Sequence, residues 1–563
     1  MKRLLPTSLA ALLLLGSGGA HAGPAKGNGN NKSKQSSPKG KPGKKQAQKA
    51  PKKDNLPDES GTTAPRVCPN PADPREQRIS QLRQRLDEVM AERPLARTRI
   101  GVTVVNAADG DVLYARNGDK LFNPASNTKI LTTAAALEKL GGDYRYVTAL
   151  VGDPPDEHGV VHGDVELRGA GDPSLTTAGI SDLARDAAAR GVTRIEGNIV
   201  ADGKFRDPQH PFDPQGGGAL IINRNVYNIR VRPTENKKPP AINIDPASPE
   251  IFTLDNKATT VKGRKTRLLV DVSRRADGRF TVTVKGRINP KAGETKIKRR
   301  MGDGALYAAA TLRRALSDYN IELTGGIKGG GLAGDAPVIA QHRSSPLAEI
   351  CRVSNKDSNN FVADAIFKTL GHEQYGGAGT LAKGARAVGE LLESVGIAAA
   401  KFKIVNGSGL THENRIEPLS LTHLLRHLYF DLSVAPEFLA SLAVGGVDGT
   451  IKHRFRGEMI GRVRAKTGTL SNVSALSGYV GDRGDVLIFS ILIDNFHHRT
   501  LEDIRIAQVR LVREMMGFVK SGGGPQPPTK IFSLPAKTPF DEETEEVEDG
   551  ESDSDIESDV GGN

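Results

Sequence analysis

The chain has 563 residues, a formal net charge of +12, 26% charged residues and two cysteines. Its length well exceeds the roughly 150 residues typical of one domain, so we expect several domains. The supply of aliphatic residues excludes global disorder, and after the first twenty residues no apolar run approaches the ~18 residues of a membrane span. Two cysteines cannot form a disulfide framework or a thiolate zinc site.

The first 22 residues have the pattern of a signal peptide. Lys2 and Arg3 precede the apolar stretch Leu4–Leu15, and Ala20-His21-Ala22 fits a cleavage site. The alternative is an uncleaved membrane anchor, for which the apolar run is short. We expect export to an oxidising compartment. The sequence leaves open whether Cys68 and Cys351 form a disulfide there.

A Lys-rich arm at residues 23–66 follows, with ten Lys and no acid between residues 23 and 53. It has no hydrophobic period and is expected to be disordered. The next segment, 67–145, predicts a helix with apolar residues three and four apart that ends at Pro94. Two strands follow, and then a second helix that starts near Ser126. The strands are Ile100–Val105 and Val112–Ala115.

Residues 146–295 differ in texture, because short β-branched runs alternate there with Gly, Pro, Asp and Asn turns. This pattern predicts a β-rich insert of one or more domains. Helical periodicity returns in residues 296–520, at 303–318, 360–371, 380–395, 418–430 and 500–517. The runs Val473–Val480 and Val486–Asp494 flank a turn and predict an antiparallel hairpin. The body is therefore an α+β domain, 67–145 and 296–520, interrupted by the insert.

Residues 521–563 form a Gly- and Pro-rich linker and an acidic tail. The tail, residues 541–563, has twelve acids and no base. Residues 2–53 carry twelve cations, which the twelve acids of the tail balance. The net charge of +12 therefore belongs to residues 54–540. Spread over that length the excess is modest, and no nucleic-acid-binding motif accompanies it, so we expect no nucleic-acid partner.

Three short motifs carry candidate chemistry. Ser126 and Lys129 lie three residues apart at a helix start, where both side chains share one face and Lys can act as the base for the Ser hydroxyl. Ser358-Asn359-Asn360 precedes a helical run. Lys466-Thr467-Gly468-Thr469 lies on a strand, where Gly allows close approach of a ligand and the cation and hydroxyls suit a carboxylate.

Each motif alone has an ordinary structural explanation. The first could be a capping Ser with a surface Lys, the second a helix N-cap cluster, and the third a strand followed by a turn. Ser36 and Lys39 have the same spacing in the arm, where it carries no meaning. All three motifs together, in this order and in these contexts, are the signature of penicillin-binding proteins and serine β-lactamases.

More closely, the chain resembles the D-alanyl-D-alanine carboxypeptidase/endopeptidase family, the class C low-molecular-mass penicillin-binding proteins of the penicillin-binding protein 4 type. The long gap between Lys129 and Ser358 is typical of that family, and so are Gly169–Leu175, Asn406–Leu410 and Gly446–Thr450. The resemblance covers roughly residues 75–515. It implies a β-lactamase-like transpeptidase domain with helices around an antiparallel sheet.

The resemblance also implies roles for the motif residues. Ser126 would be the nucleophile and Lys129 its base, while Ser358 and Lys466 would relay a proton to the leaving amine. The substrate would be held by Asn360, Thr467, Gly468 and Thr469. It implies no cofactor and no metal, and the twelve His show neither an HExxH motif nor close metal-ligand spacing. Asn359 and Asn406 replace residues that are Asp in many members.

The implied protein is a periplasmic serine D-Ala-D-Ala carboxypeptidase that acts on peptidoglycan stem peptides, cleaves cross-links as a second activity, and is acylated by β-lactam antibiotics. Two alternatives stay open. One is a serine β-lactamase or esterase on the same scaffold, against which the insert argues. The other is a non-catalytic peptidoglycan-binding protein. The Lys-rich arm is either a solubilising tail or a contact to anionic envelope polymers or lipids.

Overall fold

The structure is a computed structural model. It describes residues 74–203, 218–245, 251–275, 279–301, 303–332, 336–481 and 485–522. The predicted signal peptide, the Lys-rich arm and Cys68 lie outside these residues, as does the chain from residue 523 onward. None of the helices within the described ranges is long and apolar enough to cross a membrane.

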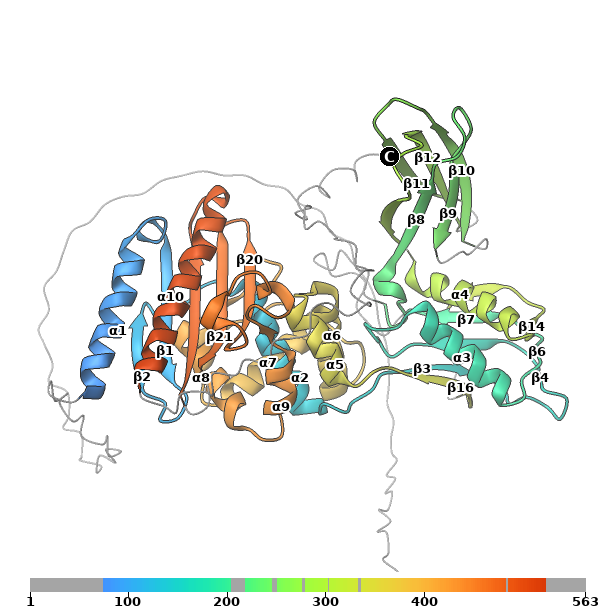
Figure 1. The fold of residues 1–563 in the computed structure, drawn as a ribbon. Coiled ribbons are helices and arrows are strands. Elements are labelled where there is room, and N and C mark those ends of the chain that lie inside the picture. Colours follow the sequence, from blue (N-terminus) through green and yellow to red (C-terminus); the bar gives the residue numbers. More distant parts are fainter. Residues whose placement is uncertain are drawn as a thin grey trace, which may run out of the picture. The chain divides into compact units, whose positions relative to one another are not determined.

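A six-stranded antiparallel sheet, in the order β19-β20-β21-β22-β1-β2, is the centre of the first domain (Figure 1). Its strands are β1 (Arg99–Asn106), β2 (Val112–Arg116), β19 (Ala443–Val444), β20 (Val463–Leu470), β21 (Val473–Gly481) and β22 (Val486–Asp494). The predicted hairpin is confirmed, because β21 and β22 pair from Val473↔Asp494 to Gly481↔Val486. Almost all residues of both strands are buried. Since successive side chains point to opposite faces, both faces of this sheet are covered.

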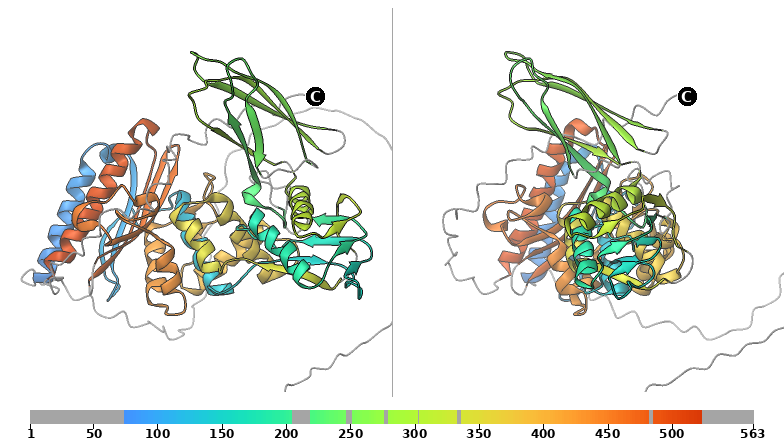
Figure 2. Two further views of the ribbon diagram at one scale, coloured as in Figure 1. Left: turned by 45° about the vertical axis from the view of Figure 1, so that its right-hand side comes forward. Right: turned by 90° about the vertical axis from the view of Figure 1, so that its right-hand side faces the viewer.

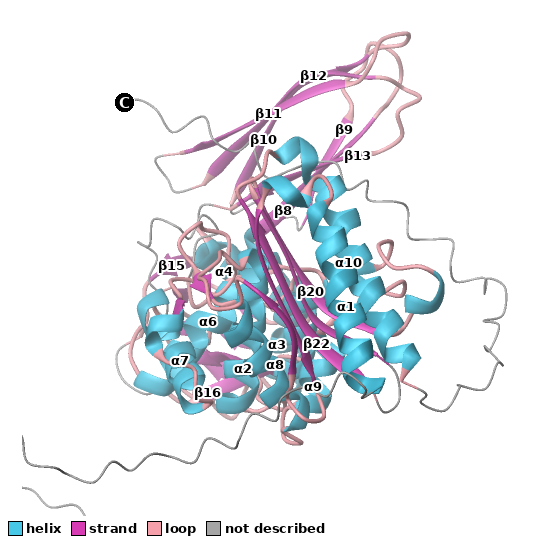
Figure 3. Ribbon diagram, turned by 90° about the vertical axis from the view of Figure 1, so that its left-hand side faces the viewer, coloured by secondary structure: helices cyan, strands magenta, loops and turns pink. Residues whose placement is uncertain are grey.

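Two long helices, α1 (Pro74–Ala91) and α10 (Leu501–Ser521), cover one face of the sheet. They lie side by side in both views of Figure 2 and in Figure 3. The predicted first helix is confirmed, since its apolar residues at three- and four-residue spacing are buried. They share one hydrophobic cluster with α10 and with Phe489 and Ile491 of β22.

The alternate residues of β22, Ile488 and Leu492, belong to a second cluster on the other face. Helix α8 (Pro418–Phe430) packs there against β22 and β1. The same cluster joins the remaining helices of this domain, which are α2 (Thr128–Leu140), α5 (Leu347–Lys356), α6 (Asn360–Tyr375), α7 (Leu381–Ser394) and α9 (Ala435–Ser441). This domain also contains a short antiparallel pair of strands, β17 (Phe402–Lys403) and β18 (Arg415–Ile416). The sequence did not predict α5 or α9.

The insert is longer than predicted. β16 (Val338–Arg343) pairs antiparallel with β3 (Val147–Val151), from Arg343↔Val147 onward. Both belong to a five-stranded sheet in the order β15-β7-β5-β3-β16, with β5 (Val165–Arg168), β7 (Ile199–Asp202) and β15 (Ile327–Gly329). Residues 296–343 therefore extend the insert and are not part of the first domain. The predicted boundary at 295 was wrong because this strand pairing joins residues 187 to 196 positions apart in sequence.

The insert is also only partly β-rich. α3 (Thr177–Ala189) and α4 (Gly304–Asp318) pack on each other and on the five-stranded sheet. Three short strands, β4 (Val160–Val161), β6 (Arg194–Ile195) and β14 (Glu322–Leu323), form a small sheet. The remaining strands form two three-stranded sheets, β13-β8-β9 and β10-β12-β11. They are β8 (Val226–Arg232), β9 (Ala241–Asp245), β10 (Phe252–Thr260), β11 (Arg267–Arg274), β12 (Phe280–Ile288) and β13 (Thr295–Arg300).

Candidate active site

Ser126 and Lys129 are in direct contact at the start of α2. Ser126 lies in a short 3-10 helix (Ala125–Asn127) that leads into α2, and Lys129 is the second residue of α2. One helical turn therefore separates the two side chains, and Lys129 Nζ donates to Ser126 Oγ at 2.8 Å. Ser126 is half-buried, whereas Lys129 is fully buried. The three-residue spacing predicted that the two side chains share one face of the helix, and their contact confirms this prediction.

The amine of Lys129 has two further acceptors, the Asn360 Oδ1 atom and the Ser408 carbonyl oxygen, each at 2.7 Å. Burial lowers the pKa of Lys129 to about 7, although the negative charge of Asp364 opposes this shift. A lysine with a pKa near neutrality is a neutral amine in part of the molecules at pH 7. It can then accept the proton of a hydroxyl group 2.8 Å away.

A second Ser–Lys pair lies beside the first. Ser358 precedes α6 with a φ of +55°, a left-handed conformation that is uncommon outside Gly and clusters at functional sites. Lys466 of β20 is fully buried, and its Nζ donates to Ser358 Oγ at 2.7 Å and to the Thr467 carbonyl at 2.8 Å. Burial, together with the positive charge of Lys129, lowers the pKa of Lys466 well below its ordinary value.

The two asparagines of the middle motif separate in the structure. Asn359 is the N-cap of α6, where its side chain accepts from Val362 N at 3.0 Å. Asn360 is the first residue of the helix and contacts Lys129. The capping explanation thus holds for Asn359, while Asn360 belongs to the site. Hydrogen bonds join Ser126, Lys129 and Asn360, and the Ser358–Lys466 pair lies near enough for the charge of Lys129 to act on Lys466.

Strand β20 runs close to the nucleophile because residue 468 is glycine. A Cβ atom at Gly468 would lie 2.7 Å from the Pro124 carbonyl oxygen and 3.0 Å from Ser126 N. The amide of Asn127 supports the same approach, since its nitrogen can donate to the Lys466 carbonyl at 2.8 Å while its oxygen accepts from Ser477. β20 is thus held against the turn that carries Ser126.

The threonines of the third motif differ in their surroundings. Thr467 is half-buried and donates from Oγ1 to Thr450 Oγ1 at 2.8 Å. Thr469 is exposed. Thr450 lies in the stretch Gly446–Thr450, where Asp448 forms an ion pair with Lys356 at the end of α5. The sequence motif did not predict the contact to Thr450.

The loop Asn406–Gly409 is the part of the site that motif reasoning missed. Its position is fixed by Asp364 Oδ1, which accepts from Gly407 N at 3.0 Å and from Ser408 N at 2.8 Å. A Cβ atom at Gly409, whose φ is +79°, would lie 1.9 Å from the Ala125 carbonyl oxygen. The loop therefore packs directly against the nucleophile turn and presents the Ser408 carbonyl to Lys129. The one available signal was the family-like stretch Asn406–Leu410.

Within the described residues, one group of side chains has metal-ligand spacing. Glu138, His427 and Asp431 place one ligand atom each within 4.8 Å of one another. Glu138 lies in the last turn of α2 and His427 in the last turn of α8, and Asp431 directly follows α8. The contacts are those of an ion-pair network, with His427 Nε2 3.2 Å from Glu138 Oε1. The sequence pattern did not predict this grouping. It shares no residue with the Ser126 site.

Cys351 is a fully buried thiol on α5, and burial raises its pKa. Cys68, the other cysteine of the chain, lies outside the described residues. The question of a Cys68–Cys351 disulfide therefore stays as open as the sequence left it.

A Ser–Lys pair at a helix start, a second Ser–Lys pair beside it, and a sheet strand against the nucleophile define a serine hydrolase of the penicillin-binding, β-lactamase-like class. The comparisons with known proteins agree. Residues 82–515 match the D-Ala-D-Ala carboxypeptidase 3 (S13) family. The chain belongs to this family, and it is therefore an enzyme, a serine-type D-Ala-D-Ala carboxypeptidase.

Two curated relatives support this assignment. The chain is 33% identical over 459 residues to a D-alanyl-D-alanine carboxypeptidase of Actinomadura sp. (strain R39), covering 77% of this chain and 84% of the relative. It is 24% identical to the D-alanyl-D-alanine carboxypeptidase DacB of Haemophilus influenzae over 443 residues, 75% of this chain and 89% of the relative.

Solved structures show the same fold. Penicillin binding protein 4 of Haemophilus influenzae superposes with a TM-score of 0.61 at 22% identity, over 78% of this chain and 98% of that one. The same protein in complex with a novel β-lactam gives a TM-score of 0.60 at 23% identity, over 77% and 97%. The predicted fold class, an α+β penicillin-binding domain with an insert, is confirmed.

Proposed function

We propose that this enzyme removes the terminal D-alanine from peptidoglycan stem peptides through an acyl-enzyme on Ser126. The observation that carries the proposal is the 2.8 Å contact between Lys129 Nζ and Ser126 Oγ, with the pKa of Lys129 lowered to about 7. A Ser hydroxyl is a poor nucleophile until a base takes its proton, and this amine is placed to do so.

In the acylation step, Ser126 Oγ attacks the carbonyl carbon of the D-Ala–D-Ala bond, and its proton passes to Lys129. The tetrahedral oxygen is negatively charged and accepts from the backbone N–H groups of Ser126 and Thr469. Each such donor is worth roughly 2.7–4 kcal/mol in other serine hydrolases. The close approach of β20 at Gly468 supports this assignment.

The carbon–nitrogen bond then breaks, and the leaving amine takes a proton through Ser358 and Lys466. Lys466 Nζ and Ser358 Oγ are 2.7 Å apart. Free D-alanine departs. Asn360 holds the substrate amide, while Thr467, Thr469 and Lys466 bind its terminal carboxylate. Water attacks the ester on Ser126 and gives one proton back to the Ser358–Lys466 pair. Lys129 returns its proton to the Ser126 oxygen, which restores the hydroxyl as the carboxylate product leaves. Each step uses only groups of this chain and water.

The same chemistry extends to two further substrates. A peptidoglycan cross-link also presents a D-Ala carbonyl, so we propose DD-endopeptidase cleavage as a second activity. β-Lactams present a strained amide to the same Ser126, and the β-lactam complex of the Haemophilus influenzae relative supports acylation here. We place the enzyme in the periplasm, on the evidence of the signal-peptide pattern in residues 1–22.

The test is release of D-alanine from a synthetic stem pentapeptide and cleavage of a purified cross-linked muropeptide dimer. The wild type should act on both, and Ser126→Ala should act on neither while remaining folded. The matched control is Ser36→Ala. Ser36 has the same three-residue spacing to Lys39 in the arm, and this variant should retain full activity. Rapid turnover of penicillin without D-alanine release would favour a β-lactamase, and absence of any hydrolysis or acylation would favour a binding protein.

A further inference from the structure

The positive charge of the body is concentrated in one part of the insert, so the expectation that it is spread over residues 54–540 was wrong. Residues 226–300, from β8 to β13, contain 19 Lys or Arg and seven Asp or Glu. Their net charge of +12 equals that of the whole body, and the rest of residues 54–540 is neutral overall. We call residues 226–300 the basic module. A net positive charge of this size attracts anions.

Within the basic module, cations line the outer face of the sheet β13-β8-β9. On β8, Tyr227, Ile229 and Val231 are buried, so the residues between them point outward. Strand pairing places Lys296 beside Arg230 and Lys298 beside Asn228 on that outer face. Along β13 the exposed residues are Lys296, Lys298 and Arg300. Alternate residues of a strand are about 6.8 Å apart, so β13 presents cations at that repeat.

β13 is also an edge strand. The sheet order places β8 on one side of it, and no other strand of the described ranges pairs with its second side. An edge strand has unpaired backbone N–H and C=O groups, which form a template for one more strand. None of the large apolar side chains that the described residues expose lies on β8, β9 or β13. The edge therefore suits a polar, extended partner.

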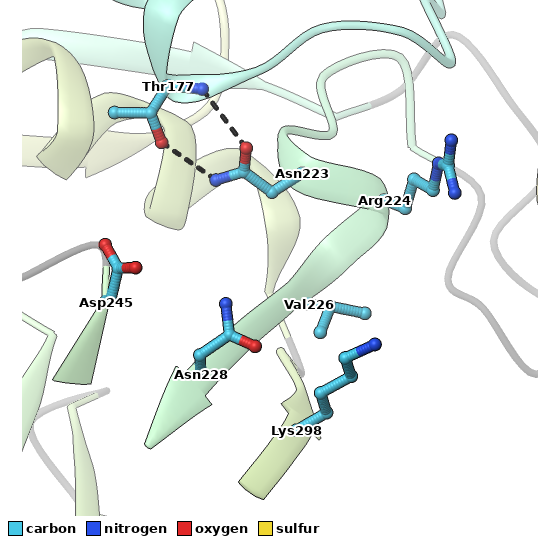
Figure 4. Close-up of a pocket in the computed structure, with 7 residues that line it drawn as sticks. All are labelled: Thr177, Asn223, Arg224, Val226, Asn228, Asp245 and Lys298. Carbon is cyan, nitrogen blue, oxygen red and sulfur yellow. Dashed lines mark hydrogen bonds between the residues drawn. The ribbon is translucent and has the colours of Figure 1, made fainter. Parts of the chain in front are cut away.

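A hollow of about 390 Å³ lies on the same face, lined by Thr177, Asn223, Arg224, Val226, Asn228, Asp245 and Lys298 (Figure 4). Figure 4 shows Arg224 and Lys298 on one side of it and Asp245 on the other. Asp245 is paired with Arg230 at 2.6 Å. Arg224 has a left-handed φ of 56°, between two asparagines that are also left-handed. The strained turn thus adds a cation to the face that carries Lys296 and Lys298.

The chain itself contains the complementary pattern. In the acidic tail, every second residue from 551 to 559 is acidic: Glu551, Asp553, Asp555, Glu557 and Asp559. In an extended conformation these five carboxylates share one side at the same repeat of about 6.8 Å. Opposite charges facing each other across paired strands stabilise a sheet. The tail is joined to the folded body after α10, which raises its effective concentration.

We propose that residues 551–559 bind as an added strand along the open edge of β13, with their carboxylates against Arg224, Lys296, Lys298 and Arg300. The basic module is then the docking surface of the chain's own acidic tail. The proposal does not depend on the catalytic function, because none of these residues belongs to the Ser126 site.

The first test measures binding of a fluorescent peptide of residues 549–563 to protein that lacks 541–563, by anisotropy at low salt. Arg224→Gln/Lys296→Gln/Lys298→Gln should weaken binding at least tenfold. The matched control, Lys262→Gln/Arg264→Gln/Lys265→Gln, removes the same charge from the exposed β10–β11 loop and should change binding less than twofold. Equal losses in the two variants, or no binding by the unsubstituted protein, would overturn the proposal.

The second test separates strand pairing from plain charge attraction. A peptide of the same composition with its acids in one block should bind at least fivefold more weakly than the natural peptide. Amide hydrogen exchange at residues 295–300 should be slower in the full chain than in the truncated one. Equal binding of the two peptides, or unchanged exchange in β13, would show that the tail does not pair there. Binding of polyphosphate that the full-length tail does not reduce would assign the face to an external polyanion and also contradict the proposal.

Discussion

At the scale of single residues, the chemistry depends on how Lys129 is held. Its amine has three acceptors, the Ser126 hydroxyl, the Asn360 amide oxygen and the Ser408 carbonyl. These oxygens are uncharged, so they fix the direction of the amine without the full compensation that a carboxylate in contact would give. Burial then dominates and lowers its pKa. Position and protonation state thus have the same structural cause.

Removing this amine tests its role. Lys129→Ala should reduce the rate of penicillin acylation by about 10²- to 10⁴-fold, because that is the usual contribution of a positioned general base. The measurement is the rate of covalent labelling by mass spectrometry. Lys139→Ala, at an exposed position in the last turn of the same helix, should label at the wild-type rate. Labelling of the Lys129 variant at the wild-type rate would exclude this lysine as the base.

The lowered pKa of Lys129 also predicts the pH dependence of acylation. The base must be neutral to accept the Ser126 proton, so the rate should rise as pH increases through about 7. Well below that pH, the rate should fall about tenfold per unit as the amine becomes protonated. The second-order rate constant of acylation between pH 5.5 and 9 measures this. A rate independent of pH, or a rise only above pH 9, would contradict the assignment.

At the scale of elements, the site depends on the contact of β20 with the turn before α2. Asn127 contacts β20 and β21 from the turn itself, and Gly468 leaves no side chain between the strand and Ser126 N. The loop Asn406–Gly409 closes on the same turn from another direction. The turn before α2, strand β20 and the loop Asn406–Gly409 are far apart in sequence, and all three meet around Ser126.

A methyl group at this contact should impair acylation. In Gly468→Ala the new Cβ would lie 2.7 Å from the Pro124 carbonyl oxygen, so backbone must shift and β20 must move away from Ser126. We expect acylation at least tenfold slower in a protein that remains folded. The control is Gly329→Ala in β15, where a Cβ atom meets nothing within 4 Å. An unchanged acylation rate in the first variant would show that close approach of β20 is not needed.

Elements with strong local periodicity were predictable from the sequence. α8 begins and ends where its pattern predicted, at 418 and 430, and the β21–β22 hairpin follows its β-branched runs and turn. The helices α3, α5 and α9 were missed. α3 lies among β-branched runs, and α9 has only seven residues. The insert boundary was missed because long-range strand pairing has no local signal.

In the site, too, residues with a local sequence signal were predictable and residues placed by the fold were not. Ser126, Lys129, Ser358, Asn360 and Lys466 were identifiable because residue type and spacing carry their chemistry. The contribution of Ser408 comes from its carbonyl oxygen, which every residue has, so only the fold distinguishes it. Asp364 was missed for a related reason. It positions the Ser408 loop by accepting from the backbone N–H groups of Gly407 and Ser408, and it belongs to none of the three motifs.

At the scale of the whole molecule, two segments of opposite charge flank a catalytic body. The Lys-rich arm has ten Lys between residues 23 and 53, and the tail has twelve acids between 541 and 563. Interactions between exposed charges weaken as salt shortens the Debye length from about 10 Å at 0.1 M to about 3 Å at 1 M. The site residues all lie between 126 and 469, so hydrolysis of a small substrate should need neither end.

Deletion of residues 23–60 tests the role of the arm. We expect weaker association with isolated cell envelopes at low salt, no difference at 1 M salt, and unchanged hydrolysis of a soluble D-Ala–D-Ala peptide. Sedimentation with envelopes and D-alanine release are the two readouts. A large loss of turnover on the small peptide would mean that the arm contributes to the active site.

The central claim is that Ser126 forms the acyl-enzyme, and one measurement addresses it directly. Folded protein is incubated with benzylpenicillin, its intact mass is recorded, and the adduct is located by peptide mapping. We predict one added penicillin per chain, carried by the peptide that contains Ser126, and none in Ser126→Ala. An adduct on another residue, or no adduct on folded wild-type protein, would contradict the mechanism.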